Sequence, residues 1–168
     1  MTLDAAAFRA AIPRLAELLV DAVESGAGVS FLAGVTEKET AAWWHAREAD
    51  VAAGVITAFV AVLDGRIMGS VLLMRSTIAN SPHRAEIGKV LVHSTARRRG
   101  IAAALMRAAE DRARADGRWL LVLDTVTGSA GDAFYRALGW QETGVVPNFA
   151  LSPDGVPWPA TFFWKDLR

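Results

Sequence analysis

The chain has 168 residues, 52% of them hydrophobic and 21% charged, a composition that can supply a folded core and excludes a disordered chain. Its 18 basic residues balance its 18 acidic residues, so there is no net charge to attract nucleic acid or an anionic membrane. The lack of cysteine excludes disulfides and thiolate nucleophiles. The three histidines lack the short spacing of metal ligands, so we expect no metal site.

The chain shows no targeting or membrane segment. It begins without a charged-then-apolar leader, and no apolar run reaches the roughly 18 residues that span a bilayer, which predicts a cytoplasmic protein without membrane partners. Internal repeats, low-complexity tracts and linkers are also absent. We therefore expect one domain over residues 1–168.

Two helices are predicted in the first third of the chain. Any strand before them, at residues 1–6, is expected to be short. Pro13 suits the first turn of a helix over residues 12–25, where apolar side chains recur at helical spacing. Thr36 and Glu39 have the spacing of a capping box, which predicts a second helix running to about residue 51.

The pattern then changes to that of strands. Residues 55–63 are β-branched and aromatic, Asp64-Gly65 is typical of a two-residue hairpin turn, and residues 66–75 form the expected return strand. The remaining predicted elements are, in order, a strand at 85–93, a helix at 100–116, a strand at 119–126, a helix at 130–138, a strand at 140–146, a loop at 147–159 and a strand at 161–165. Strand–helix–strand units imply parallel pairing and the hairpin implies antiparallel pairing, so we expect an α+β fold with a mixed sheet.

A basic turn gives the clearest binding signal. The run Arg97-Arg98-Arg99-Gly100-Ile101-Ala102 joins a strand to the predicted start of a helix, where free N–H groups and the helix dipole attract an anion. A solvated basic face or a nucleic-acid contact is the alternative, but no aromatic residues interleave with this turn. The glycine patterns of dinucleotide-binding and P-loop folds are absent.

Two motifs in this region resemble a known family. The pattern Arg97-x-x-Gly100-x-Ala102 after Val90-Leu91-Val92 resembles the coenzyme A signature of the GNAT superfamily of N-acetyltransferases. The segment Phe134-Tyr135-x-x-Leu138-Gly139-Trp140 resembles a second motif of that superfamily at suitable spacing. The resemblance implies the GNAT fold: a splayed mixed sheet with helices on its faces, in which acetyl-CoA lies in the V between strands 85–93 and 119–126.

Further segments resemble the tabtoxin-resistance type of acetyltransferase, and this likeness covers nearly the whole chain. They are His83-Arg84-Ala85-Glu86, Leu123-Asp124-Thr125, Gly128-Ser129 and Pro153-Asp154-Gly155. One position departs from the superfamily: Gly128 stands where an asparagine often contacts the pantetheine arm, so no such contact is expected here.

The resemblance implies which residues hold the acetyl donor. The main-chain N–H of Leu91 or Val92 is the implied donor to the developing oxyanion, and the basic turn is implied to hold the pyrophosphate. The full set of expected cofactor-binding residues is Leu91, Val92, Arg97, Arg98, Arg99, Gly100, Ile101, Ala102 and Ala103.

Two strand carboxylates are candidates for handling the acceptor's proton, because an amine must be neutral to attack a thioester. Strand alternation places Glu86 on one face with Gly88, Val90 and Val92, and an apolar setting should raise the pKa of such a carboxyl. Asp124 is the candidate on the neighbouring strand, and the resemblance implies an acid–base role for both. The alternative is structural: Glu86 pairs with Arg84 or Lys89, and Asp124 caps the next turn.

Tyr135, the only tyrosine, is the candidate acid for the departing thiolate, the role that the resemblance implies. The alternative is a core aromatic with its hydroxyl at the edge. Ser129 is expected to be a helix N-cap rather than a catalytic group. Candidate lining residues of an acceptor pocket are Trp43, Trp44, Trp140, Phe149 and Trp158.

Together these features predict an acetyl-CoA-dependent N-acetyltransferase that acts directly on the primary amine of a small molecule, such as an amino-acid-like toxin or antibiotic. The alternatives are acetylation of a protein N-terminus or lysine, and a non-catalytic coenzyme A-binding module. The loop at 147–159 would close a small-molecule pocket. A homodimer is expected to form through the edge at 161–165 or the N-terminal helices.

Overall fold

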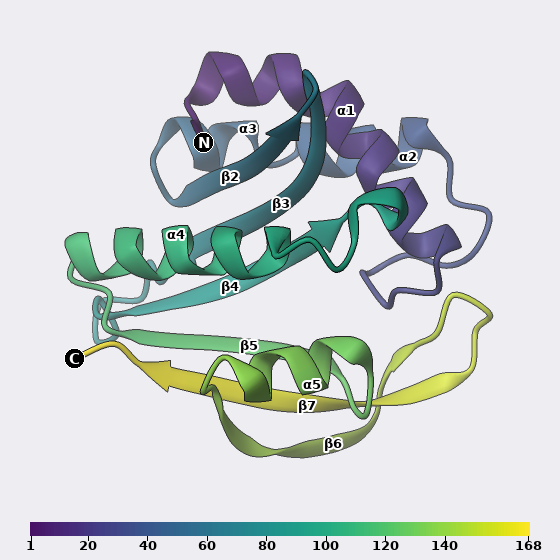
Figure 1. Ribbon diagram of the computed structural model, residues 1–168. Helices are drawn as coiled ribbons and strands as arrows, with labels where there is room; N and C mark the ends of the chain where they lie inside the picture. Colours follow the sequence, from purple (N-terminus) through teal and green to yellow (C-terminus); the bar gives the residue numbers. More distant parts are fainter.

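The computed structural model describes residues 1–168, which form one mixed sheet with helices on both faces (Figure 1). Its strands are β1 (Thr2–Leu3), β2 (Ile56–Leu63), β3 (Arg66–Arg75), β4 (Arg84–Val92), β5 (Leu120–Val126), β6 (Gln141–Leu151) and β7 (Pro157–Asp166). Its helices are α1 (Ala5–Glu24), α2 (Glu37–His45), α3 (Glu48–Ala52), α4 (Ile101–Ala115) and α5 (Ala130–Ala137), with a 3-10 turn at Ser94–Ala96. None of these helices has both the length and the apolarity that crossing a bilayer requires.

The strand order is β1-β2-β3-β4-β5-β7-β6, with parallel pairing between β4 and β5 and antiparallel pairing elsewhere. The expected mixed α+β sheet is therefore confirmed. The hairpin turn is also confirmed: Asp64 and Gly65 both have positive φ, at 48° and 75°, as a two-residue turn between twisted strands requires.

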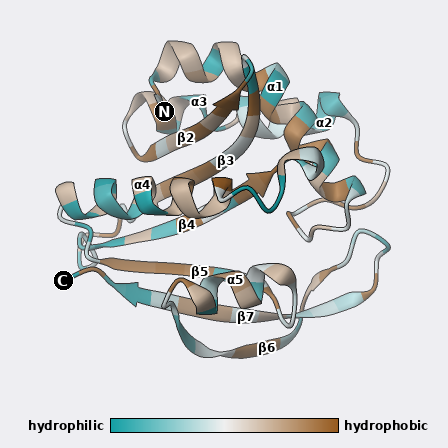
Figure 2. Ribbon diagram, in the orientation of Figure 1, coloured by the Kyte–Doolittle hydropathy of each residue, from teal (hydrophilic) through white to brown (hydrophobic).

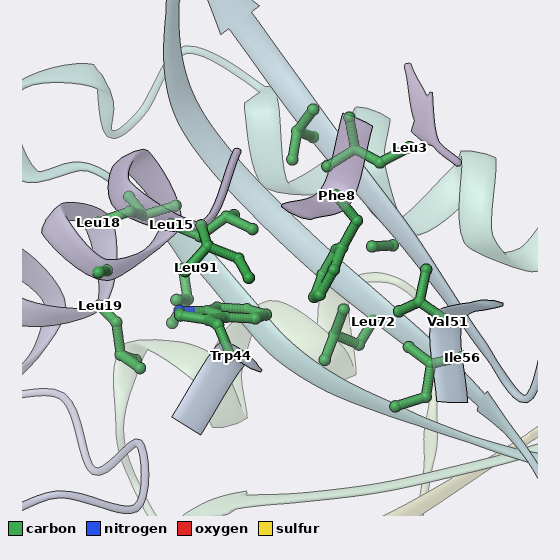
Figure 3. Close-up of a cluster of buried hydrophobic side chains, with 14 of the residues drawn as sticks. Leu3, Phe8, Leu15, Leu18, Leu19, Trp44, Val51, Ile56, Leu72 and Leu91 are labelled. Atoms are coloured by element: carbon green, nitrogen blue, oxygen red, sulfur yellow. The ribbon is translucent and has the colours of Figure 1, made fainter. Parts of the chain in front are cut away.

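Each face of the sheet carries its own apolar core: the α1 core and the α4 core, each named after the helix that covers it. On one face, α1 and α2 pack on β2 and β3, and Phe8, Trp44 and Leu72 are almost fully buried there (Figure 3). On the other face, α4 packs across the sheet, with Met106 and Leu121 buried. Figure 2 shows hydrophobic colouring along the central strands, which these helices cover. Helices therefore pack on both faces of the central strands.

Two of the expected helix boundaries are wrong. α1 begins at Ala5 rather than residue 12, because Asp4 caps it by accepting from the Ala7 N–H, and Pro13 lies inside the helix. The capping box of Thr36 is confirmed, but the helix it begins is interrupted after His45. The guanidinium of Arg47 donates to the Trp43 carbonyl at 2.6 Å, taking the acceptor that a continuous helix would offer to the Arg47 N–H.

The expected loop at 147–159 is largely strand. β6 continues to Leu151 and β7 begins at Pro157, so only residues 152–156 form the connection. A register shift between Val146 and Ala150 carries β6 past Pro147, which has no N–H to donate. Residues 161–165 are also not a sheet edge, because β7 lies between β5 and β6. A second copy therefore cannot pair with that segment as expected, and β6 is the edge strand.

Gly69 on β3 lets α4 lie close to the sheet. A Cβ added there would lie 2.9 Å from Ile101 Cγ2 and 3.0 Å from the Leu91 carbonyl oxygen. We expect Gly69→Ala to destabilise the fold by about 1–3 kcal/mol through this overpacking, which lowers Tm by about 2–12 °C in calorimetry. Gly88→Ala is the matched control, because its Cβ would meet only the flexible Cε of Met74. Equal Tm values for the two variants would contradict this close approach.

Candidate functional site

The site begins where β4 and β5 separate. The two strands pair only between residues 84–86 and 120–122, and β4 then leaves β5 (Figure 1). Parallel strands that part leave the polar main-chain groups of their facing edges without strand partners. The expected V between these strands is therefore present, and adjoining cavities open into it, two of which contain most of the candidate residues.

The first cavity, of about 450 Å³, lies against the start of α4. The helix begins after Gly100, whose φ of 77° favours glycine, and no side chain caps its first turn. In α1, α2 and α5, by contrast, the side chain of Asp4, Thr36 or Ser129 accepts from a first-turn N–H. The start of α4 therefore keeps its N–H groups and the positive end of its dipole free for an anion.

Most of the expected cofactor-binding residues line this cavity. They are Leu91, Val92, Arg97, Arg98, Gly100, Ile101, Ala102 and Ala103. Arg99 lies instead in a separate hollow with Met1 and Phe59. Arg97 ties the basic turn back to β4 by donating from Nε to the Val92 carbonyl at 3.3 Å. The structure thus brings together eight of the nine positions around one anion-binding helix start.

One main-chain N–H of β4 faces the opening. His93 donates its N–H to the Met68 carbonyl at 2.9 Å, towards β3. Because successive N–H groups along a strand point to opposite edges, the N–H of Val92 points towards the open edge and that of Leu91 points towards β3. Of the two expected oxyanion donors, Val92 has the suitable orientation.

The second cavity, of about 370 Å³, holds both carboxylate candidates. Glu86 lies opposite Val122 in the parallel register, and Asp124 follows two residues later on the same face of the sheet. Burial raises the pKa of Glu86, and the nearby charge of Asp124 raises it further. Burial likewise raises the pKa of Asp124, although Lys89 opposes this rise. Both side chains stay accessible within the cavity, and a carboxyl with a raised pKa is a better proton acceptor than one with an ordinary pKa.

The structural alternative for these carboxylates is not what the structure shows. No ion pair joins Glu86 to Arg84 or Lys89. The turn after β5 is capped by Ser129, which accepts from the Asp132 N–H at 3.2 Å, rather than by Asp124. Both carboxylates are therefore left open to the cavity.

A β-bulge at Lys89 corrects the expected alternation along β4. Lys89 has a positive φ of 49°, and the pairing with β3 shifts register between Ser70 and Leu72. Beyond this point Val90 packs with the α4 core, whereas Leu91 joins the α1 core. The expectation that Val90 and Val92 share the face of Glu86 is therefore wrong.

Two cations that the sequence did not single out as functional also line the cavity, Lys89 at the bulge and Arg47 at the junction of α2 and α3. Lys89 reaches Trp43, with Nζ 4.5 Å from the centre of the indole ring, and donates to Ser30 Oγ at 3.0 Å. Arg47 stacks on the same ring, with Cζ 3.0 Å from its centre. Burial and the neighbouring charge of Arg47 lower the pKa of Lys89 to about 8. Two sequence signals were usable: the i, i+4 spacing of Trp43 and Arg47, and the isolated Gly88 inside the strand, which is typical of a bulge.

Tyr135 stands between the two cavities and lines both. Its ring packs in the α4 core beside Trp140 and Phe163, and only 7% of the residue is exposed. Burial and then the charge of Asp124 raise the pKa of its hydroxyl above the ordinary value, so the phenol keeps its proton at neutral pH. The core reading and the functional reading of Tyr135 are therefore compatible.

The aromatic candidates divide into two groups. Trp43, Phe149 and Trp158 line the second cavity. Trp44 and Trp140 are buried in the two cores, with 0% and 3% of their surfaces exposed, and do not reach it. Aromatic side chains of α2, β6 and β7 therefore line the cavity. The loop before α2 and the β6–β7 connection are joined by the Ala33 N–H, which donates to the Pro153 carbonyl at 2.8 Å.

Comparison with known proteins places this architecture. The family model described as "Acetyltransferase (GNAT) family" matches residues 16–140. An N-acetyltransferase from Staphylococcus aureus Mu50 is similar in structure, with a TM-score of 0.81 and 18% identity, over 100% of this chain and 98% of that one. A ribosomal-protein-alanine N-acetyltransferase from Brucella melitensis gives 0.76 and 23%, over 99% of each chain. A putative acetyltransferase, yncA, from Salmonella typhimurium, whose structure includes its cofactor acetyl-CoA, gives 0.74 and 19%, over 95% and 90%.

Proposed function

The chain belongs to the acetyltransferase (GNAT) family, whose members use acetyl-CoA, and we propose that it acetylates the primary amine of a small molecule. The observation that carries this proposal is the pair of adjoining cavities. One lies against the uncapped start of α4, the other contains Glu86 and Asp124, and Tyr135 lines both. Of the GNAT subgroups, we propose the tabtoxin-resistance type, on the motif residues around Glu86 and Asp124.

The first cavity fits acetyl-CoA. The free N–H groups at the start of α4, with Arg97 and Arg98, suit a pyrophosphate, and the edge of β4 suits an extended arm. When bound there, acetyl-CoA supplies the activated acetyl group. The N–H of Val92 is oriented to donate to the thioester carbonyl oxygen as negative charge develops on it.

The second cavity is suited to receive the amine. Glu86 and Asp124 accept the proton that a bound ammonium group must lose before it can attack, directly or through water. Tyr135 donates a hydrogen bond to the departing thiolate sulfur or gives it the proton. Transfer is direct, so no protein nucleophile is needed. The cavity volume of about 370 Å³ is in the range of small-molecule sites, which favours a small molecule over a polypeptide.

The test is an acetyl-CoA-dependent thiol-release screen on the purified protein. The panel comprises amino acids, aminoglycosides, polyamines and short peptides, with product mass confirming N-acetylation. We expect sustained turnover with one class of small amine and none with peptides. Acetyl-CoA binding without transfer to any panel member would overturn the proposal and favour a non-catalytic coenzyme A-binding module. Turnover with peptides alone would favour protein acetylation.

The pH dependence of kcat should directly reflect the ionisation of Glu86 and Asp124. A base works only when deprotonated, and a raised pKa moves the loss of activity at falling pH to a higher pH than an ordinary carboxyl gives. Asp124→Asn removes the charge that raises the pKa of Glu86, so the acid limb of the kcat profile should move to lower pH. Glu86→Gln should lower kcat about a hundredfold. An acid limb that stays in place in Asp124→Asn would contradict the coupling.

A further inference from the structure

Four charged side chains line the second cavity without an ion-pair partner in the protein. Two are the acids Glu86 and Asp124, and two are the bases Arg47 and Lys89. None of them takes part in any ion pair of the chain. Arg47 and Lys89 are partly buried, and a partly desolvated charge is costly unless it is paired. The cavity is therefore suited to a ligand that supplies an anionic partner for the two bases and a cationic partner for the two acids, which remain accessible.

The two bases lie together on one wall. Both contact the indole of Trp43, Arg47 at 3.0 Å and Lys89 at 4.5 Å from its centre. The only hydrogen bonds of their cationic groups go to the Trp43 carbonyl and to Ser30 Oγ, both neutral acceptors. Two like charges beside one ring repel each other, and an anion bound between them would relieve this repulsion.

Lys89 and Arg47 both lie where the backbone departs from regular secondary structure. The bulge puts Lys89 into a positive φ, which is uncommon for a residue with a side chain. The break between α2 and α3 frees the Trp43 carbonyl to accept from the Arg47 guanidinium. Two separate departures from regular secondary structure therefore converge on one pair of cations.

From this charge arrangement we infer that the acceptor is a zwitterion, an amino acid or close analogue, whose carboxylate is held by Arg47 and Lys89 while its amine faces Glu86 and Asp124. Trp43 serves as the platform that orients both cations. This inference rests on the proposed function and adds the recognition of the acceptor's anionic group. The planar guanidinium supplies paired donors for a carboxylate, and the ammonium adds a point charge.

The experiment compares matched acceptors with the whole enzyme and saturating acetyl-CoA. Each series consists of an L-amino acid, its primary amide and its decarboxylated amine, for methionine, leucine, phenylalanine and glutamate. We expect kcat/KM to be about ten- to hundredfold higher for the acid than for the amide or amine in at least one series, as a charge-assisted contact predicts. The amide has the less basic amine, so ease of deprotonation would favour it instead.

The variants Arg47→Gln and Lys89→Gln should each remove most of this preference, mainly by raising KM for the acid, and leave the acetyl-CoA dissociation constant unchanged. Lys38→Gln and Arg66→Gln are the matched controls, because both side chains are exposed and neither lines the cavity. Since Arg47→Gln also loses the stacking on Trp43, its Tm is measured, and Lys89→Gln gives an independent result.

The outcomes separate the two proposals. Acetylation of the amines or amides at rates equal to the acids would overturn the carboxylate anchor and leave small-molecule transfer standing. A preference for the acid that persists in both variants would also overturn the role of Arg47 and Lys89. No acetylation of any member by an enzyme that binds acetyl-CoA would overturn the anchor together with the proposed function.

Discussion

Tyr135→Phe is expected to lower kcat about a hundredfold or more, because the substitution removes the one protonated group that lies between the two cavities. The pKa of the hydroxyl is raised by burial, so the phenol is protonated throughout the neutral range. A departing thiolate therefore always finds a donor there. Steady-state kinetics at saturating acetyl-CoA measures the change, and the loss should be the same at pH 7 and pH 9.

The substitution separates chemistry from packing. The aromatic neighbours of Tyr135, Trp140 and Phe163, lie at 6.0 and 6.1 Å between ring centres, and phenylalanine keeps these contacts. The hydroxyl makes no hydrogen bond within the protein, so the substitution removes none. Tm and the acetyl-CoA dissociation constant should therefore stay close to those of the parent protein. Unchanged kcat would mean that the thiolate leaves without this group.

The features that could be predicted from the sequence are those set by local geometry. Gly100 and the arginines before it mark a helix start, and the free N–H groups of a helix start follow from the helix itself. Glu86 and Asp124 stood out as single acids in apolar strands, and their side-by-side position follows once β4 and β5 pair in parallel. Each of these parts of the site is set by a single helix or by a single pair of strands.

The features that could not be predicted depend on a break in periodicity. Strand alternation places Lys89 with Ile87, towards the α4 core. The isolated Gly88 indicates an irregular strand, but it does not show that Lys89 takes the positive φ that reverses its direction. Arg47 was expected inside a continuous helix, where the Trp43 carbonyl accepts from the Arg47 main-chain N–H and not from its guanidinium. Arg47 and Lys89 contact the same Trp43 ring only after β4 and α2 have packed together.

The predicted loop at 147–159 was wrong for a different reason. Pro147 and Asn148 are residues typical of loops, and they led to a predicted loop where β6 in fact continues. As an edge strand, β6 needs hydrogen bonds on one side only, so it tolerates a proline and a residue with positive φ. Turn residues in an edge strand therefore did not indicate a chain reversal. The reversal is at residues 152–156.

Gly100→Asp is expected to weaken acetyl-CoA binding roughly a hundredfold, about 2.7 kcal/mol, because it places a carboxylate at the uncapped start of α4. An aspartate at this position can accept from the first-turn N–H groups, so it occupies the donors that a pyrophosphate would use and repels the phosphates by its charge. A Cβ at Gly100 meets nothing within 4 Å, and aspartate tolerates positive φ better than most residues. Isothermal titration with acetyl-CoA measures the effect.

Two controls separate charge from backbone strain. Gly100→Asn has nearly the same shape and tolerance of positive φ without the charge, so its loss of affinity should be several-fold smaller than that of Gly100→Asp. Gly65→Asp places the same residue at a φ of 75° in the β2–β3 turn, away from both cavities, and should leave the dissociation constant unchanged. Equal losses in Gly100→Asp and Gly100→Asn would assign the effect to the backbone. Unchanged affinity in Gly100→Asp would place the pyrophosphate elsewhere than at the start of α4.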